Sequence, residues 1–220
     1  MKFIVVGSTG LIGSYVAKTL SKYGTVVGVS RTTDIKVDVK DPASIKAMYE
    51  KVGKVDAVAS CIGKVVYKPI TEISYDDYLI SFKDKALGQV ELVRAGIDYL
   101  IDGGSFTLMT GVLARDPIPT SSAAALANGA VESFTLAAAI DLPRGLRINT
   151  VSPNVLIEAT SYHAKFAGYH QVSAQSVADA YVKSILGKQT GQIYKLDRFF
   201  YQISFDHIAK YFLINWPIIR

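Results

Sequence analysis

The sequence is poor in cysteine, because its 220 residues include only Cys61. A single cysteine excludes an intramolecular disulfide and a metal site built from several cysteines. The chain also lacks an apolar stretch long enough to span a membrane, and its start, Met1-Lys2-Phe3, lacks the layout of a signal peptide. We therefore expect a cytoplasmic protein with no membrane span and no bound metal.

Charge of one sign is not concentrated anywhere in the sequence. Lysine and arginine number 24 against 19 aspartate and glutamate residues, which gives a formal net charge of +5, and the basic residues are scattered. This distribution is typical of a solvated surface and argues against a nucleic-acid groove, although some positive potential would suit an anionic ligand. We expect a small-molecule partner and no nucleic acid.

The composition is otherwise that of one globular domain. Half of the residues are hydrophobic, 20% are charged, and no shift in composition divides the chain. We predict one α/β domain over residues 1–196 and an aromatic-rich tail over residues 197–220. The pattern of the tail favours a helix over Phe205–Trp216, for which the sequence indicates no function.

Three glycines follow the first apolar run. The segment Met1–Val6 has the consecutive apolar side chains of a strand buried on both faces, and an amphipathic helical pattern begins near Leu11. Gly7 allows a sharp turn, Gly10 leaves room for a phosphate, and Gly13 lets the helix pack closely on the strand. The pattern predicts a dinucleotide site at the helix start, the alternative being a plain tight turn. The residues assigned to it are Gly7, Ser8, Thr9, Gly10, Leu11, Ile12 and Gly13.

A second predicted strand, Thr25–Ser30, is followed by Arg31. In a dinucleotide-binding fold this strand end lies beside the adenosine ribose, where a basic residue accepts a 2′-phosphate. Ser30 and Arg31 are therefore assigned to the cofactor site. The guanidinium of Arg31 matches a phosphate well, so we expect NADP(H) rather than NAD(H); the alternative is a solvated surface arginine.

The next segments repeat the order of strand and helix. They are a short third strand over Ile35–Val39, a helix capped by Asp41 and begun by Pro42, and a fourth strand over Val55–Ser60. This alternation predicts a parallel sheet with helices on both faces. We expect a doubly wound Rossmann-type sheet of about seven strands in a single domain.

Several segments resemble the short-chain dehydrogenase/reductase family. Residues 7–13 resemble its glycine-rich loop, Asp38-Val39 its adenine-contacting pair, and residues 60–63 the segment after its fourth strand. Residues 104–111, 128–134 and 142–153 are similar to its fifth strand, the helix after it, and its sixth strand with the following loop. The resemblance covers roughly the first 195 residues. It implies further cofactor contacts at Asp38, Val39, Cys61, Ile62, Gly63, Asn128, Pro153, Asn154 and Val155.

The catalytic positions depart from the pattern of that family. The family uses a tyrosine, a lysine four residues later on the same helix face, and a serine at the end of strand five. Aligning the segment around Asn128 places Asn128 at the lysine position, Ala124 at the tyrosine position and Gly111 at the serine position. No tyrosine lies between residues 99 and 162, so a local change of alignment does not restore the motif.

Lys85 and Thr110 are the catalytic candidates that remain. Lys85 falls on the position of a structural asparagine of the family, where burial would lower the pKa of its ammonium and let it protonate a carbonyl oxygen. Thr110, beside Gly111, would hydrogen-bond the same oxygen. The alternative for Lys85 is a solvated surface lysine. His163 and His170 lie where the family carries its substrate loop, either as general acids or as exposed loop histidines.

Two functions are compatible with these patterns. The first is an NADP(H)-dependent oxidoreductase acting on a small carbonyl or alcohol, and the second is a non-catalytic NADP(H)-binding sensor or regulatory protein. Residues 120–140 are rich in alanine, and the family often pairs its helices there across a dimer axis. The resemblance therefore implies a homodimer or homotetramer, the alternative being an ordinary helix packed on the sheet.

Overall fold

The computed structural model describes residues 1–197, which form a doubly wound α/β domain. Six strands make one sheet in the order β2-β1-β3-β4-β5-β6, and each neighbouring pair is parallel. The strands are β1 (Lys2–Val6), β2 (Thr25–Val29), β3 (Val55–Ser60), β4 (Leu100–Met109), β5 (Arg147–Pro153) and β6 (Ile193–Leu196). The helices are α1 (Leu11–Leu20), α2 (Pro42–Val52), α3 (Tyr75–Ser81), α4 (Gly88–Gly96), α5 (Ser122–Asp141) and α6 (Ala174–Leu186). Shorter helical segments are Phe82–Leu87, Ile97–Tyr99, Val112–Ala114 and Thr160–Phe166. The predicted fold class is confirmed.

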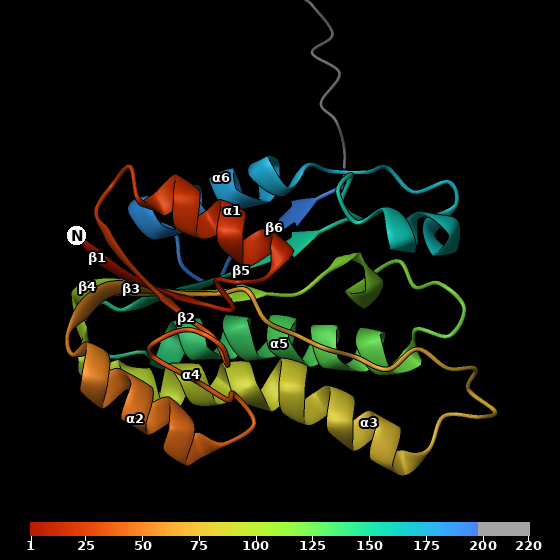
Figure 1. The fold of residues 1–220 in the computed structure, drawn as a ribbon, viewed down its shortest axis with the longest axis horizontal. Coiled ribbons are helices and arrows are strands. Elements are labelled where there is room, and N and C mark those ends of the chain that lie inside the picture. The colour runs from red at the N-terminus through yellow and green to blue at the C-terminus, as the bar shows by residue number, and fades with distance from the viewer. Residues whose placement is uncertain (198–220) are drawn as a thin grey trace, which may run out of the picture.

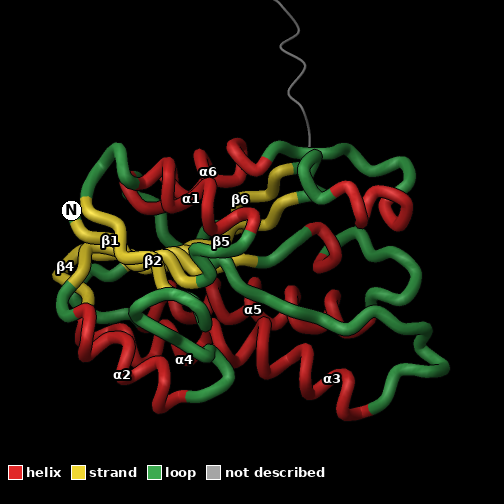
Figure 2. Tube along the Cα trace, viewed as in Figure 1, coloured by secondary structure: helices red, strands yellow, loops and turns green. Residues whose placement is uncertain are grey.

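The helices form two layers around the sheet. Helices α1 and α6 cover one face, and α2, α4 and α5 cover the other (Figure 1). The strands lie as a single layer between them (Figure 2). Each face has its own apolar core, so the sheet is buried on both sides, as a parallel sheet requires.

Strand β1 lies in the interior because its side chains are apolar in succession. Ile4 and Val6 belong to the core under α2, α4 and α5, whereas Phe3 and Val5 belong to the core under α1 and α6. All four are 0% exposed. The uninterrupted apolar run thus serves both faces of the sheet, since successive side chains of a strand point to opposite faces.

Helix α1 packs closely on the end of β1 through a glycine. A Cβ atom added to Gly13 would lie 2.0 Å from the carbonyl oxygen of Gly7. No side chain fits at that position without moving the backbone. The close approach directs the N-terminus of α1 toward the carboxyl ends of the strands, where ligands bind in sheets of this type.

The prediction of a strand over Ile35–Val39 is wrong. The segment makes a single bridge between Ser30 and Lys36, so the sheet of the described residues has six strands rather than about seven. Side chains take over hydrogen bonds that a strand ladder would use. The Thr33 hydroxyl donates to the carbonyl of Ile35, and the Ser44 hydroxyl accepts the amide of Asp38. Such local bonds favour a turn over an extended strand.

Other boundaries agree with prediction. Strand β3 spans the predicted Val55–Ser60, and α2 begins at Pro42 as expected. The Asp41 carboxylate accepts the Ala43 amide at 2.9 Å and so caps α2. Strand β2 ends one residue before the predicted Ser30.

Helix α5 is the one described helix that is long and apolar enough to cross a membrane by length and composition. In the fold it lies against the sheet and buries one face, including Ala127 and Val131, in the core. A core helix of an α/β domain passes the same test, so the composition of α5 is explained by its packing.

The predicted tail, residues 197–220, lies outside the described residues apart from Asp197. The helix predicted over Phe205–Trp216 also lies outside them.

Gly13→Ala should lower the free energy of unfolding by more than about 2 kcal/mol, because its Cβ would overlap the backbone of Gly7. Gly129→Ala is the matched control. A Cβ at Gly129, within α5, meets nothing within 4 Å, so this change should stabilise the protein by about 0.5–1 kcal/mol through helix propensity. Denaturant unfolding of both variants checks the prediction, and equal effects would contradict it.

Candidate functional site

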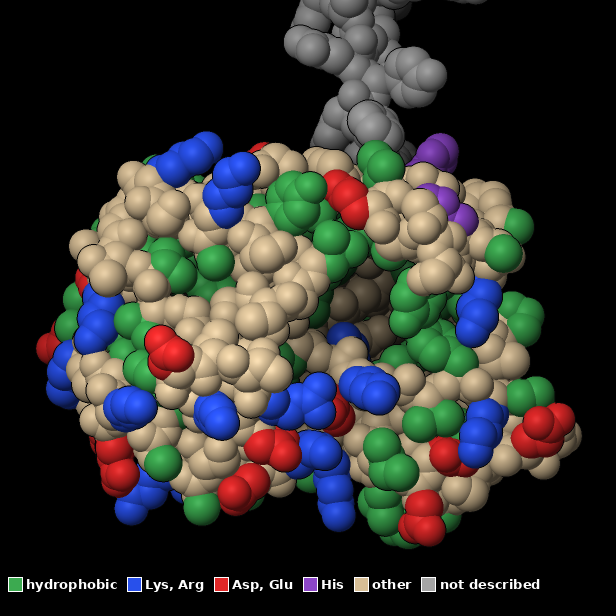
Figure 3. Space-filling view, viewed as in Figure 1, with side chains coloured by type: hydrophobic (Ala, Val, Ile, Leu, Met, Phe, Trp, Pro, Cys, Tyr) green, Lys and Arg blue, Asp and Glu red, His purple; other side chains and the backbone are tan. Residues whose placement is uncertain are grey.

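A cleft of about 630 Å³ lies at the carboxyl ends of the central strands. It opens where β1 stands between β2 and β3, the point at which successive strands are added on opposite sides. Ligands of doubly wound sheets bind at this kind of switch point. Figure 3 shows the hollow, with lysine and arginine side chains gathered along part of its rim. The basic residues that line the cleft are Arg31, Lys40, Lys64 and Lys85.

The glycine-rich loop forms one wall of the cleft. Gly7 has a φ of +82°, and a Cβ there would lie 2.8 Å from the carbonyl oxygen of Cys61. Gly10 is the N-cap of α1 and lines the cleft together with Thr9 and Ile12. The loop therefore brings backbone and the positive end of a helix to the cleft, which suits a phosphate group.

Three residues assigned to the loop site do not line the cleft. Ser8 turns its hydroxyl toward Gly28 of β2, where a Cβ would meet that oxygen at 2.7 Å. Leu11 is 41% exposed. Gly13 serves the packing of α1 against the strand instead. These three residues were assigned to the site because they are neighbours in sequence of Gly7, Thr9 and Gly10. The fold places them outside the lining of the cleft.

The segment after β2 forms the end of the cleft. The Ser30 hydroxyl accepts the Thr32 amide at 3.1 Å and so shapes the turn. Arg31 is exposed and lines the cleft, as do Asp38 and Val39. A guanidinium on the rim of a cleft with a phosphate cradle is well placed for a second phosphate.

Lys85 is buried in the cleft wall rather than solvated. It lies in the π-helical segment Phe82–Leu87 and is 7% exposed. Its side chain runs over Gly63, where a Cβ would lie 2.6 Å from Nζ. Burial lowers the pKa of Lys85 to about 8, against a smaller opposing effect of Asp84. None of the ion pairs within residues 1–197 includes Lys85.

Gln89 ties Lys85 to the end of strand β4. Its Nε2 donates at 2.8 Å to the carbonyl oxygens of Lys85 and Met109, and its Oε1 accepts the Met109 amide at 2.8 Å. Gln89 is 0% exposed. One buried side chain thus joins the backbone of Lys85 to the residue that precedes Thr110, so both candidate residues are held in the same wall.

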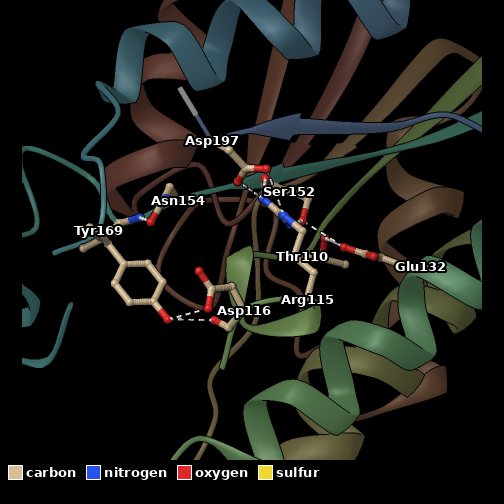
Figure 4. Close-up of polar contacts among 9 residues, drawn as sticks. Thr110, Arg115, Asp116, Glu132, Ser152, Asn154, Tyr169 and Asp197 are labelled. Atoms are coloured by element: carbon tan, nitrogen blue, oxygen red, sulfur yellow. Dashed lines mark hydrogen bonds and ion pairs between the residues drawn. The ribbon is translucent and has the colours of Figure 1, made fainter. Parts of the chain in front are cut away.

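Thr110 is buried and its hydroxyl is engaged. The hydroxyl donates to Glu132 Oε1 at 3.0 Å, and the hydroxyl of Ser152 donates to the same oxygen at 2.8 Å. Arg115 donates to Ser152 and forms an ion pair with Asp197 (Figure 4). The sequence reasoning assigned no role to Glu132. Its spacing of four residues from Asn128, which puts both on one helix face, is the signal that could have found it.

The positions of the family's catalytic residues lie in the same cleft. Gly111, Ala124 and Asn128 all line it. Asn128 is 3% exposed, and its Oδ1 has no hydrogen-bond partner among the described residues. The methyl group of Ala124 offers no proton and the amide of Asn128 does not ionise, so these two positions supply neither an acid nor a base.

Two tyrosines that sequence reasoning missed line the cleft, Tyr67 from the loop after β3 and Tyr162 from the short helical segment Thr160–Phe166. Tyr67 and Tyr162 have ring centroids 6.4 Å apart, and Lys165 lies 5.1 Å from the centroid of Tyr67. Burial raises the pKa of Tyr67 to about 12. The two residues are far apart in the sequence, and no local pattern marks either of them.

The loop after β5 also reaches the cleft. Pro153, Asn154 and Val155 line it, and the Asn154 side chain accepts the Val155 amide at 2.8 Å. His163 contacts the carbonyl of Leu156 at 2.8 Å and does not line the cleft.

His170 borders a second hollow of about 480 Å³. This hollow also contains Arg115, Asp116, Tyr169 and Asp197 (Figure 4). The structure therefore separates both histidines from the main cleft.

Cys61 and Ile62 line the cleft beside Gly63. Burial raises the pKa of the Cys61 thiol to about 12, which keeps it protonated and unreactive near neutral pH. The loop after β3 therefore contributes shape rather than acid–base chemistry.

Comparisons with known proteins agree with this architecture. A sequence profile described as enoyl-(acyl carrier protein) reductase matches residues 11–193. The solved structure of the protein lin1944 from Listeria innocua is 46% identical, with a TM-score of 0.87 over 89% of this chain and 98% of that one. A small-chain dehydrogenase solved in complex with NADPH is 26% identical, with a TM-score of 0.81 over 90% of this chain and 96% of that one. An uncharacterised oxidoreductase of Methylorubrum extorquens is 24% identical over 190 residues, which are 75% of this chain and 77% of the relative.

The fold and the matching family model define a Rossmann-type α/β domain of the oxidoreductase class. The chain belongs to the short-chain dehydrogenase/reductase family.

Lys85→Met should raise the free energy of unfolding at pH 7 by about 3 kcal/mol, because the folded protein then no longer buries an ammonium. Below pH 8 the amine is protonated in both states, so the gain is constant. Between pH 8 and 10.5 the folded protein releases its proton first, wild-type stability rises with pH, and the gain shrinks. Denaturant unfolding of the wild type and of Lys85→Met at pH 7 and 9.5 measures this difference in the free energy of unfolding. Lys83→Met, at an exposed position of the same segment, is the control; a gain independent of pH would contradict the assigned pKa.

Proposed function

We propose that the protein is an NADP(H)-dependent oxidoreductase that acts on a small carbonyl compound or alcohol. The observation that carries the proposal is one cleft that combines a glycine cradle, a basic rim and the buried amine of Lys85. The first two features suit a dinucleotide with an additional phosphate, and the third suits proton transfer.

The residues present fit the cofactor. Gly7, Thr9 and Gly10 would hold the pyrophosphate at the start of α1, because their backbone lies in the cleft without obstructing side chains. Arg31 would bind the 2′-phosphate of NADP(H). The loop at Asn154 would supply main-chain groups to the nicotinamide end. A relative of known structure was solved with NADPH, which supports this choice of cofactor.

Lys85 would carry the proton. When bound, NADPH supplies the hydride, so the protein has to orient the substrate and deliver one proton to its oxygen. With a pKa of about 8, the Lys85 ammonium is protonated near neutral pH and loses its proton more readily than a solvated lysine. In the reverse direction the neutral amine would accept the proton of an alcohol.

A specific observation favours the second candidate function, a non-catalytic NADP(H)-binding sensor or regulatory protein. Ala124 and Asn128 occupy the helix positions at which the family carries its tyrosine and lysine. The two functions share the same cofactor site and differ in turnover.

We further propose a homodimer or homotetramer. Helix α5 leaves Leu126, Leu136 and Ile140 exposed by 52, 52 and 86%, and an apolar outer side of this kind suits an isologous contact. Light scattering at micromolar concentration tests this assembly. The cytoplasmic location expected from the sequence stays a prediction.

Calorimetric titration of the protein should show tighter binding of NADPH than of NADH. Arg31→Ala should weaken NADPH binding by about 10- to 100-fold and leave NADH binding unchanged, because only NADPH carries the 2′-phosphate. Arg94→Ala is the control, since Arg94 lies exposed on α4 and pairs with Glu91. If none of NADPH, NADP, NADH and NAD binds, the proposed function is wrong.

Lys85→Met should lower kcat for carbonyl reduction by about 100- to 10,000-fold while NADPH still binds. For the wild type, the reduction rate should fall as the pH rises through about 8, where the ammonium loses its proton. A screen of aldehydes and ketones followed by NADPH absorbance measures both effects. NADPH binding without turnover across the screen would favour the sensor, and unchanged turnover in the variant would exclude Lys85 as the acid.

A further inference from the structure

The hydrogen bonds around Glu132 have only one possible direction. Arg115 can only donate, and its Nη1 lies 2.7 Å from the Ser152 hydroxyl oxygen. Ser152 therefore accepts from Arg115 and passes its own hydrogen to Glu132 Oε1 at 2.8 Å. The carboxylate can only accept, so the Thr110 hydroxyl must also donate to it, at 3.0 Å. Because Arg115 can only donate and the Glu132 carboxylate can only accept, the hydroxyl hydrogens of Ser152 and Thr110 must both point to Glu132.

The side chains of this hydrogen-bonded series are held in fixed positions. Ser152 is 0% exposed and Thr110 is 4% exposed, and the amide of Thr110 donates to the carbonyl of Val151 at 2.9 Å. The guanidinium of Arg115 is fixed from the other side by Asp197, which it contacts through two nitrogens. Turning the Thr110 hydroxyl away from Glu132 would remove one of the two hydrogen bonds that Oε1 accepts, which is costly.

We propose that Glu132 is a positioning residue that makes Thr110 a hydrogen-bond acceptor toward the ligand in the cleft. The one hydrogen of the Thr110 hydroxyl points to Glu132, so only its lone pairs remain for a ligand. The group that meets Thr110 must then be a donor, an O–H or N–H, and cannot be a carbonyl oxygen. The sequence analysis expected Thr110 to hydrogen-bond the same carbonyl oxygen that Lys85 protonates. With its hydrogen held by Glu132, the Thr110 hydroxyl does not donate to that oxygen.

This inference rests on the proposed function for the class of ligand, an alcohol or its carbonyl counterpart. The alcohol has a hydroxyl hydrogen to give to Thr110 and can still accept a hydrogen bond from the Lys85 ammonium. The ketone can accept from Lys85 but has nothing to offer Thr110. The cleft should therefore hold the alcohol more tightly than the ketone, and Glu132 should set that preference.

The test compares two ligands that share a carbon skeleton, 1-phenylethanol and acetophenone. Their aromatic ring suits the part of the cleft lined by Tyr67, Leu113 and Phe166. Affinities are measured by saturation-transfer NMR on the full chain without cofactor, so that no turnover occurs. The variants are Glu132→Leu, Glu132→Gln and Thr110→Val, with Glu50→Leu as a control at an exposed position of α2.

The wild type should bind the alcohol about five- to tenfold more tightly than the ketone, the value of one good hydrogen bond. Thr110→Val should abolish the preference. Glu132→Leu should abolish or invert it, because the freed hydroxyl can donate to the ketone. Glu132→Gln should retain it, because the amide oxygen can replace Oε1 as the acceptor. A merely structural role of Glu132 would not move the ratio of the two affinities.

A second readout does not depend on any ligand. The Thr110 hydroxyl proton should exchange slowly with water in the wild type and in Glu132→Gln, and rapidly in Glu132→Leu, as observed by NMR. Equal exchange in all three would overturn the proposal, as would equal binding of both compounds to the wild type, failure of either to bind, or an unchanged ratio in Glu132→Leu. The NADPH titration is run on the same samples. Protein that binds no NADPH refutes the proposed function, whereas protein that binds NADPH without preferring the alcohol refutes only the role of Glu132.

Discussion

The close contact between helix α1 and strand β1 is the constraint on which the rest of the structure depends. With Gly13 against the carbonyl of Gly7, the helix can start directly at the end of a central strand. The same geometry brings Thr9 and Gly10 into the cleft and points the partial positive charge of the helix at it. Any side chain at Gly13 would push the helix away and open the site. The close packing of α1 and the shape of the cleft therefore share one cause.

At the other end of the cleft, the wall contains buried polar groups. Lys85 is held by its packing over Gly63 and by the clamp of Gln89, although burying an ammonium destabilises the fold. In the same wall as this amine, Glu132 and Ser152 direct the Thr110 hydroxyl. The cleft thus combines a buried amine whose pKa is lowered with a hydroxyl whose hydrogen is directed to Glu132. Burial of the Lys85 ammonium trades stability for polarity at a defined place, as functional sites commonly do.

Sequence reasoning succeeded where the signal is local. Strand β3 has its predicted bounds, and Asp41 caps α2 as expected, because periodicity and capping act within a few residues. It failed at Ile35–Val39, where the side chains of Thr33 and Ser44 compete for backbone hydrogen bonds. It also missed Tyr67 and Tyr162, which meet in the cleft from two segments that lie far apart in the sequence. Loop conformation depends on distant packing partners, and one sequence does not reveal them.

The amino-acid sequence by itself determined the doubly wound fold, the glycine loop and the family, because each depends on patterns of residues close along the chain. Only the tertiary structure decided that Lys85 is buried rather than solvated, since its exposure depends on Gly63 and on contacts with α5. It also decided that the Thr110 hydroxyl donates to Glu132, which lies 22 residues away. Hydrogen-bond direction and desolvation depend on groups that folding brings together, so no reading along the chain could supply them.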